Sequence, residues 1–312
     1  MPWYKGNLHC HSSRSDGQAT PEDVGKYYRL QDHDFLGLSD HNRFTPPAQW
    51  AEPAGLLGIP CCEYTGETCC HVVAVGVTQP VAPAPSRRRK PRAKATIIQD
   101  GIDRTRAAGG IPVVCHPAWR WTLDYAEMAA LRRCNHFEIC NASPDCNAYP
   151  VPGFEPLDNL WDRLLTAGHR FFGLANDDAH DYFRPYAPRA PVGGLGYNVV
   201  QTPTLTVRHV VEAIRRGRFY ATTGIELARY RVTRAGLSLA VRRKQEEQTV
   251  FQFFGAGGRE LRRLIGERAV YRFKGDEGYV RVRISSTAGY WAWTQPVFLD
   301  DLADAIRWTA AD

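Results

Sequence analysis

Histidine and carboxylate residues recur through roughly the first 180 residues at spacings that would let them bind metal ions together. His9 and His11 stand two apart, and so do Asp178 and His180. Because successive side chains of a strand point to opposite faces, residues two apart project to one side and can hold one cation. The candidate ligands are His9, His11, Asp16, His41, Glu63, His71, His116, Asp178 and His180. Imidazole and carboxylate without thiolate suit Mn²⁺, Fe²⁺ or Zn²⁺ and disfavour a structural zinc.

Several candidate ligands directly follow short apolar runs, where buried strands would end. Residues 35–38 lead to His41, residues 113–115 lead to His116, and residues 171–174 lead to Asp178. In barrels of alternating strands and helices, ligands meet at the C-terminal strand ends. Helical patterns between the runs fit this architecture, and they cover residues 22–31, 96–109, 123–132, 155–167 and 206–216.

The motifs around these residues resemble the polymerase and histidinol phosphatase (PHP) family of metal-dependent phosphoesterases. The resemblance runs from about residue 4 to 224 and rests on residues 7–12, 15–17, 38–42, 71–76, 115–117 and 178–180, together with Glu63. It implies an α/β fold, a distorted (β/α)7 barrel, with two or three divalent metal ions at its mouth. The implied ligand sets are His9, His11, Glu63 and Asp178 for the first metal, bridging Glu63 with His71 and His116 for the second, and Asp16, His41 and His180 for the third.

Neighbouring carboxylates leave alternatives at two ligand positions. Glu67 is an alternative to Glu63 as the bridge, and Asp177 is an alternative to Asp178. We prefer Glu63 because it ends the apolar run that begins at residue 56, and Asp178 because it stands two residues from His180. Asp40, adjacent to His41, should point elsewhere and could orient a ligand.

The C-terminal region resembles the CehA/McbA-like subgroup of the same family. Residues 218–224, 279–283 and 292–298 carry this resemblance, which implies a small β-rich appendage after the barrel. Alternating apolar residues in 229–233, 237–241, 249–254 and 279–284 predict strands with one buried face. We therefore expect a metallohydrolase barrel over residues 1–224 and a β-rich subdomain over 225–312. Tyr290, Trp291 and Trp293 could bury against the barrel or against a partner in a homo-oligomer.

The clustered metals predict a hydrolase that acts on ester bonds, specifically a phosphoric ester hydrolase. Hydroxide that bridges two metals would attack a phosphate monoester or diester of a small molecule. The residues expected to take part in catalysis are Glu63, Asp178 and His180. Arginines close to the ligand motifs could clamp phosphate oxygens, and these are Arg14, Arg43, Arg120 and Arg184.

Three other functions remain open from the sequence. The same metal hydroxide could attack a carbonyl, which would make the chain a carbamate, ester or amide hydrolase. A non-catalytic metal-binding module would be expected to have lost ligand positions, and none is lost here. A proofreading role beside a polymerase is known for this family, but the chain carries no polymerase modules.

Composition and charge agree with a large globular enzyme. The 312 residues are 44% hydrophobic and 23% charged, with a net charge of +6. The densest basic run, in the loop 86–94, lies among prolines, and we interpret it as a solvated loop rather than an anion-attracting lid. Nucleic-acid binding is disfavoured because no aromatic-interleaved platform accompanies the charge.

Cysteine and histidine usage elsewhere predicts ordinary buried residues and a cytoplasmic location. The nine cysteines form no paired Cys-x-x-Cys module, and an odd count argues against a disulfide framework. Free cysteines fit a reducing compartment, and we expect neither a signal peptide before His9 nor a membrane span. Histidines outside the motifs should not bind metal, namely His33, His136, His169 and His209.

Overall fold

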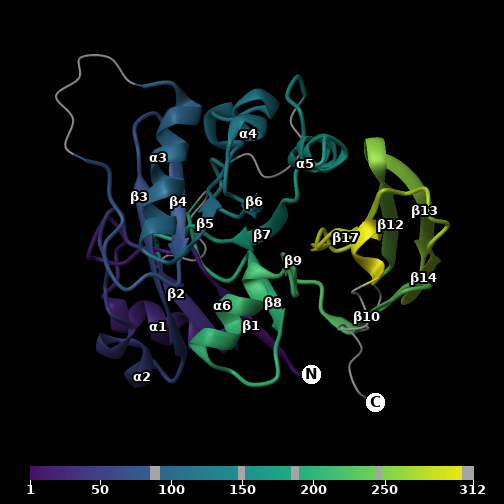
Figure 1. The fold of residues 1–312 in the computed structure, drawn as a ribbon. Coiled ribbons are helices and arrows are strands. Elements are labelled where there is room, and N and C mark those ends of the chain that lie inside the picture. The colour runs from purple at the N-terminus through teal and green to yellow at the C-terminus, as the bar shows by residue number, and fades with distance from the viewer. Residues whose placement is uncertain (85–91, 147–151, 184–189, 243–246, 304–312) are drawn as a thin grey trace.

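The computed structural model describes residues 1–84, 92–146, 152–183, 190–242 and 247–303 (Figure 1). Strands and helices alternate through the first part of the chain, in the order β1 (Trp3–Asn7), α1 (Pro21–Arg29), β2 (Phe35–Leu38), α2 (Ala51–Ala54), β3 (Leu57–Thr65), β4 (His71–Val75), α3 (Lys94–Ala107), β5 (Ile111–Val114), α4 (Tyr125–Ala130), β6 (His136–Asn141), α5 (Leu157–Thr166), β7 (Phe172–Asn176), β8 (Tyr197–Gln201), α6 (Val207–Arg215) and β9 (Phe219–Thr222). The helices predicted from periodicity are present as α1, α3, α4, α5 and α6, with ends within two residues of the prediction.

The C-terminal part of the chain contains strands and short 3-10 turns in the residues described. The strands are β10 (Leu227–Thr233), β11 (Gly236–Val241), β12 (Thr249–Gly255), β13 (Arg259–Ile265), β14 (Arg268–Arg272), β15 (Tyr279–Ser286), β16 (Trp291–Thr294) and β17 (Val297–Phe298). They lie to one side of the α/β part in Figure 1. The division at residue 224 stays a prediction, because β16 pairs with β9 and so joins both parts in one sheet.

The predicted barrel is not confirmed, because most of the described strands form an open mixed sheet, and β10, β11 and β14 form a separate antiparallel sheet. The hydrogen-bonded order of the open sheet is β13-β12-β15-β16-β9-β8-β1-β2-β3-β4-β5-β6-β7, with β17 beside β15. Strands β1 to β3 are parallel, as are β5 to β7, whereas β4 and β8 run antiparallel to their neighbours. The path ends at β7 and does not return to β8.

Side-chain amides take the place of a neighbouring strand at the free edge of β7. Asn198 on β8 accepts from the Ala175 N–H at 3.1 Å and donates to the Ala175 carbonyl at 2.7 Å. Gln295 accepts from the Gly173 N–H at 2.9 Å and donates to its carbonyl at 2.8 Å. A primary amide offers the same donor and acceptor as a peptide group, so the buried edge is satisfied without closing the sheet.

Buried charge fixes the C-terminal strands against α5. Arg281 on β15 is fully buried, and its guanidinium donates to Asp162 at 2.6 and 2.7 Å and to Asp158 at 2.8 Å. The Trp293 indole donates to Asp158 at 3.2 Å. Trp293 is thus buried against α5, in the α/β part of the chain, whereas Tyr290 is 38% exposed. The homo-oligomer remains a prediction.

The cysteines are free thiols, and all except the half-buried Cys69 are buried. Among the described helices, none has the length and apolar character that a bilayer crossing requires.

Candidate metal centre

The ligand candidates lie at neighbouring strand ends and converge on one point. His9 and His11 follow β1, His41 follows β2, and Asp178 and His180 follow β7. Glu63 and His71 belong to the antiparallel pair β3 and β4, where their registers bring them to the same end of the sheet. All of the residues that the sequence singled out as ligands make at least one close contact with another member of the set.

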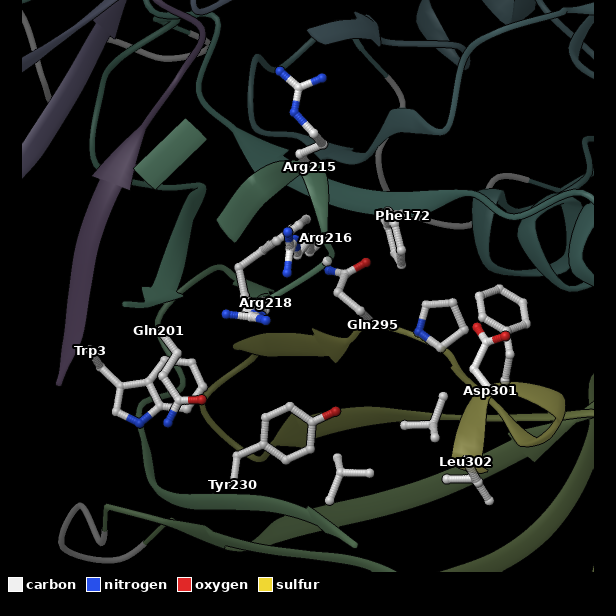
Figure 2. Close-up of a pocket in the computed structure, with 16 residues that line it drawn as sticks. Trp3, Phe172, Gln201, Arg215, Arg216, Arg218, Tyr230, Gln295, Asp301 and Leu302 are labelled. Carbon is white, nitrogen blue, oxygen red and sulfur yellow. The ribbon is translucent and has the colours of Figure 1, made fainter. Parts of the chain in front are cut away.

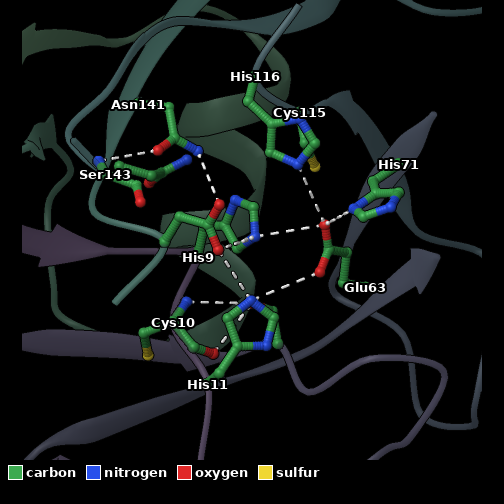
Figure 3. Close-up of polar contacts among 12 residues, drawn as sticks. His9, Cys10, His11, Glu63, His71, Cys115, His116, Asn141 and Ser143 are labelled. Carbon is green, nitrogen blue, oxygen red and sulfur yellow. Dashed lines mark hydrogen bonds and ion pairs between the residues drawn. The ribbon is translucent and has the colours of Figure 1, made fainter. Parts of the chain in front are cut away.

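Glu63 lies at the centre of the cluster. Its side chain is 0% exposed, and imidazole nitrogens surround both oxygens, with His41 at 2.6 Å, His71 at 3.0 Å, His9 at 3.4 Å, His11 at 3.5 Å and His116 at 3.6 Å. Figure 3 shows the rings of His9, His11, His71 and His116 directed toward this carboxylate. Glu67 instead lies 35% exposed beside Arg92, so the structure places Glu63 inside the cluster and leaves Glu67 outside.

Asp178 joins the cluster, and its neighbour Asp177 faces away from it. Asp178 Oδ1 lies 3.0 Å from His11 Nε2 and 3.1 Å from His9 Nε2. Asp177 accepts hydrogen bonds from the backbone N–H groups of residues 194–196 at 2.7–2.8 Å and from the Tyr28 hydroxyl at 2.9 Å. The preference for Asp178 therefore matches the geometry, and Asp177 anchors the loop before β8.

Backbone strain accompanies two of these ligands. Asp178 has φ 52° and His116 has φ 32°, a region that non-glycine residues rarely occupy. Such conformations persist where the surrounding structure enforces them, and they concentrate at functional sites.

A second subset lies farther out. One nitrogen or oxygen from each of His11, Asp16, His41 and His180 lies within 4.8 Å of the others. Asp16 Oδ1 is 3.4 Å from His180 Nε2, and Asp16 Oδ2 is 3.5 Å from His41 Nε2. The Asp16 side chain is 56% exposed. This group contains the three residues expected for a third metal and adds His11.

Carboxylates and imidazoles inside the cluster shift one another's pKa values. Burial opposes ionisation of Glu63, but the imidazoles of His9, His71 and His41 hold its pKa well below the ordinary value. Burial would also lower the pKa of His41, yet the carboxylates of Glu63 and Asp16 raise that pKa to about 10. A protonated imidazole cannot coordinate, so a metal ion that binds His41 must displace its proton.

Two buried atoms point to cations rather than to hydrogen-bond partners. His9 Nε2 and Glu63 Oε2 make no hydrogen bond of acceptable geometry among the described residues. Buried polar atoms without such bonds are rare in native proteins. Their convergence with nitrogen and oxygen donors fits Mn²⁺, Fe²⁺ or Zn²⁺. Cys115 lies near His9 and Glu63, but burial raises the pKa of its thiol and disfavours the thiolate that would coordinate.

Sequence reasoning missed Glu138, a fully buried carboxylate on β6. It lies 2.7 Å from His9 Nδ1 and accepts from the His116 N–H at 2.8 Å. Asn141 and Asn176 donate to it at 2.9 and 3.0 Å. Glu138 therefore orients His9 and the strand end that carries His116. The available signal was a lone acidic residue within the apolar run of residues 137–140.

Asp40 orients a ligand through the loop that carries it. Its carboxylate accepts from the Ser12 N–H, the Ser12 hydroxyl and the Ser15 hydroxyl, each at 2.8 Å. It points away from His41, as expected, and fixes the turn that leads to Asp16. Of the histidines expected to lie outside the site, His33 contacts the backbone carbonyl of Gln31 and His136 that of Ile214.

The predicted phosphate-binding arginines are only partly brought to the site. Arg120, at φ 50°, lies over the Trp119 ring at 5.2 Å, and that ring contacts His116 at a centroid distance of 4.9 Å. Arg14 and Arg43 are exposed. Arg184 lies outside the described residues, as do most of the basic residues of the loop 86–94.

The similarity of this chain to known proteins lies in its three-dimensional structure. No family model matches the chain, and no curated protein sequence does. A two-domain protein from Bacteroides vulgatus, described as containing a predicted PHP-like metal-dependent phosphoesterase, aligns over 91% of this chain and 90% of its own, with 15% identity and a TM-score of 0.51. A lesion-specific endonuclease from Pyrococcus furiosus aligns over 70% of this chain and 56% of its own, with 16% identity and a TM-score of 0.46. The CehA/McbA-like placement stays a prediction. The chain therefore shares the fold of the PHP-like metal-dependent phosphoesterases.

Proposed function

We propose that this chain is a metal-dependent hydrolase of small-molecule phosphate esters. The observation that carries the proposal is the buried Glu63 carboxylate, around which imidazoles from β1, β2, β4 and β5 converge. Divalent cations held there would lower the pKa of a coordinated water and offset the charge of a phosphoryl group. We infer two or three ions of Mn²⁺, Fe²⁺ or Zn²⁺.

The chain's own residues would hold this apparatus in place. Glu63 and Asp178 supply buried anionic oxygens between histidines, and Glu138 fixes the His9 ring through Nδ1. His180 Nδ1 donates to the Asp178 carbonyl at 2.8 Å, and its Nε2 faces the exposed side of the cluster, 3.4 Å from Asp16. With two ions bound and no ion in the outer group, this position suits His180 for passing a proton to a departing alkoxide.

Charge favours a phosphate ester over a neutral ester. Several cations facing one substrate stabilise a dianionic phosphoryl group more than an uncharged carbonyl. Arg120 beside Trp119 adds a guanidinium at the rim formed by His71 and His116. The resemblance to the CehA/McbA-like subgroup makes cleavage of carbamates, carboxylic esters or amides the alternative that an experiment must test.

A substrate panel tests the proposal. Purified protein reconstituted separately with Mn²⁺, Fe²⁺ and Zn²⁺ would be assayed on nitrophenyl phosphate, bis(nitrophenyl) phosphate, a nitrophenyl carbamate and a nitrophenyl ester. We expect higher kcat/KM on a phosphate substrate, competitive inhibition by inorganic phosphate and loss of activity on chelation. Efficient carbamate cleavage without phosphoesterase activity in any preparation would replace the proposal with a carbonyl hydrolase.

A further inference from the structure

A cavity of about 460 Å³ lies between the α/β part and the C-terminal strands (Figure 2). It is bounded by the start of β1, the end of α6, the start of β7 and residues of β10 and β17. None of the candidate metal ligands lines it. Its volume falls within the range of small-molecule sites, whereas packed interiors rarely leave voids larger than a water molecule.

Aromatic side chains form part of the cavity wall. Trp3 and Tyr230 lie with nearly parallel rings, 22° apart at a centroid distance of 6.4 Å, and Figure 2 shows both beside the open space. Phe172, Phe219 and Phe298 complete the apolar lining. These faces favour a ligand with a planar or extended hydrocarbon body.

Positive charge outweighs negative charge around this apolar space. Three arginines and one aspartate line the cavity. Arg215 and Arg216 are exposed and pair with Glu212, and Asp301 pairs with Arg170. Arg218 is less exposed than the other two arginines, and Figure 2 places its guanidinium on the same side as Trp3 and Gln201.

The backbone holds Arg218 at this position. Its N–H donates to the Ala213 carbonyl at 2.8 Å, and its carbonyl accepts from the Gln201 N–H at 2.9 Å. The Gln201 side chain lines the same wall and, among the described residues, donates to the Met1 carbonyl over a long 3.5 Å. Gln201 pairs with Trp3 across β8 and β1, so a guanidinium and an amide line the same cavity as the aromatic rings.

We propose that this cavity binds an organic monoanion, in which an aryl or long alkyl body packs between Trp3, Tyr230 and Phe298 and the anionic group lies beside Arg218. A guanidinium binds carboxylates and sulfonates through charge-assisted hydrogen bonds. The site is separate from the metal centre and does not depend on the reaction catalysed there.

Binding of 8-anilinonaphthalene-1-sulfonate tests the site, with the uncharged N-phenyl-1-naphthylamine as the matched dye without the anionic group. We expect one sulfonate dye per chain, displaced by decanoate or naphthoate and unaffected by inorganic phosphate or by metal loading. Displacement by phosphate, or by metal loading, would place the dye at the metal centre and overturn the proposal.

Two kinds of variant test separately how the charge and the shape of the cavity contribute to dye binding. Arg218→Gln should weaken the sulfonate dye about tenfold and leave the neutral dye unchanged, since one charge-assisted contact is lost. Arg268→Gln, an exposed change on β14 outside the cavity, should change neither. Leu302→Trp and Val297→Trp would each occupy the space and should remove binding of both dyes.

Retained melting temperature and circular dichroism would show that a variant is folded. Full dye affinity in both folded tryptophan variants would overturn the proposal, as would equal loss of the two dyes in Arg218→Gln. A dimer in solution that both tryptophan variants dissociate would assign the cavity to a second copy of the chain instead.

Discussion

The ligand cluster has an inner half around Glu63, with His9, His71, His116 and Asp178, and an outer half with Asp16, His41 and His180. The fold holds these two halves in different ways. Glu63, His9 and His71 are buried on or next to strands, and Glu138 supports His9 from behind. Asp16 lies in a loop with its side chain 56% exposed, and the turn before it is fixed by Asp40. Strands impose ligand geometry through their register, whereas a loop ligand depends on a few side-chain hydrogen bonds. The inner half should therefore bind its ions more tightly and contribute more to turnover.

The largest effect is expected from Glu63→Gln. Removing one anionic oxygen from the centre of five imidazoles should lower kcat/KM at least about a thousandfold, because Glu63 would be the ligand shared by the inner ions. Steady-state kinetics and elemental analysis would measure it. Glu67→Gln is the matched control, since Glu67 faces Arg92 outside the cluster. If the control loses activity and Glu63→Gln keeps it, the central carboxylate has been misassigned.

The second largest effect is expected from lowering the pH, which should weaken metal binding. The pKa of His41 is raised to about 10, although burial opposes the shift, by the carboxylates of Glu63 and Asp16. Below that pKa the ring is protonated, and each proton displaced by a metal costs about tenfold in affinity per pH unit. Calorimetric titration at pH 8 and pH 6 should show at least about a hundredfold weaker binding at pH 6, with protons released. Equal affinity at both values would contradict imidazole coordination.

Glu138→Gln should have an intermediate effect, confined to the inner half. The carboxylate orients His9 without belonging to the ligand set, and loss of such partners lowers metal affinity by about 10–100-fold. Glu277→Gln is the control, since Glu277 is also fully buried but accepts from Tyr271 and residues 274–275 in the C-terminal part. If both variants are destabilised to a similar extent but only Glu138→Gln binds metal more weakly, Glu138 positions His9 in addition to stabilising the fold. Equal metal affinities in the two variants would reduce Glu138 to a structural residue.

The ligand pattern was predictable from the sequence because it depends on local chain geometry. Glu63 could be preferred over Glu67, and Asp178 over Asp177, from their place after an apolar run and from alternation. Glu138 was not predictable in the same way, because a single acidic residue inside a strand has no spacing partner that signals its role. It becomes meaningful only when β5 and β6 pair and bring His116 beside it.

Whether the sheet closes into a barrel could not be predicted from local sequence, for a related reason. Several strands could be identified from their own residues, but whether β7 pairs with β8 depends on groups far apart in the chain. Asn198 and Gln295 occupy the hydrogen-bonding positions at Gly173 and Ala175. Sequence position gives no indication that two amide side chains will stand in for a strand.

Asp16→Asn should produce the smallest effect and would most sharpen the distinction between the two halves. The substitution removes charge from the outer group only, where Asp16 contacts His41 and His180. We expect one fewer ion per chain, a kcat/KM loss of about tenfold and an unchanged melting temperature of the metal-free protein, since an exposed carboxylate contributes little to stability. Glu22→Gln, an exposed change on α1, is the control. Loss of all bound ions in Asp16→Asn would show instead that the inner and outer halves bind metal as a single unit, and the difference in burial would then have no functional counterpart.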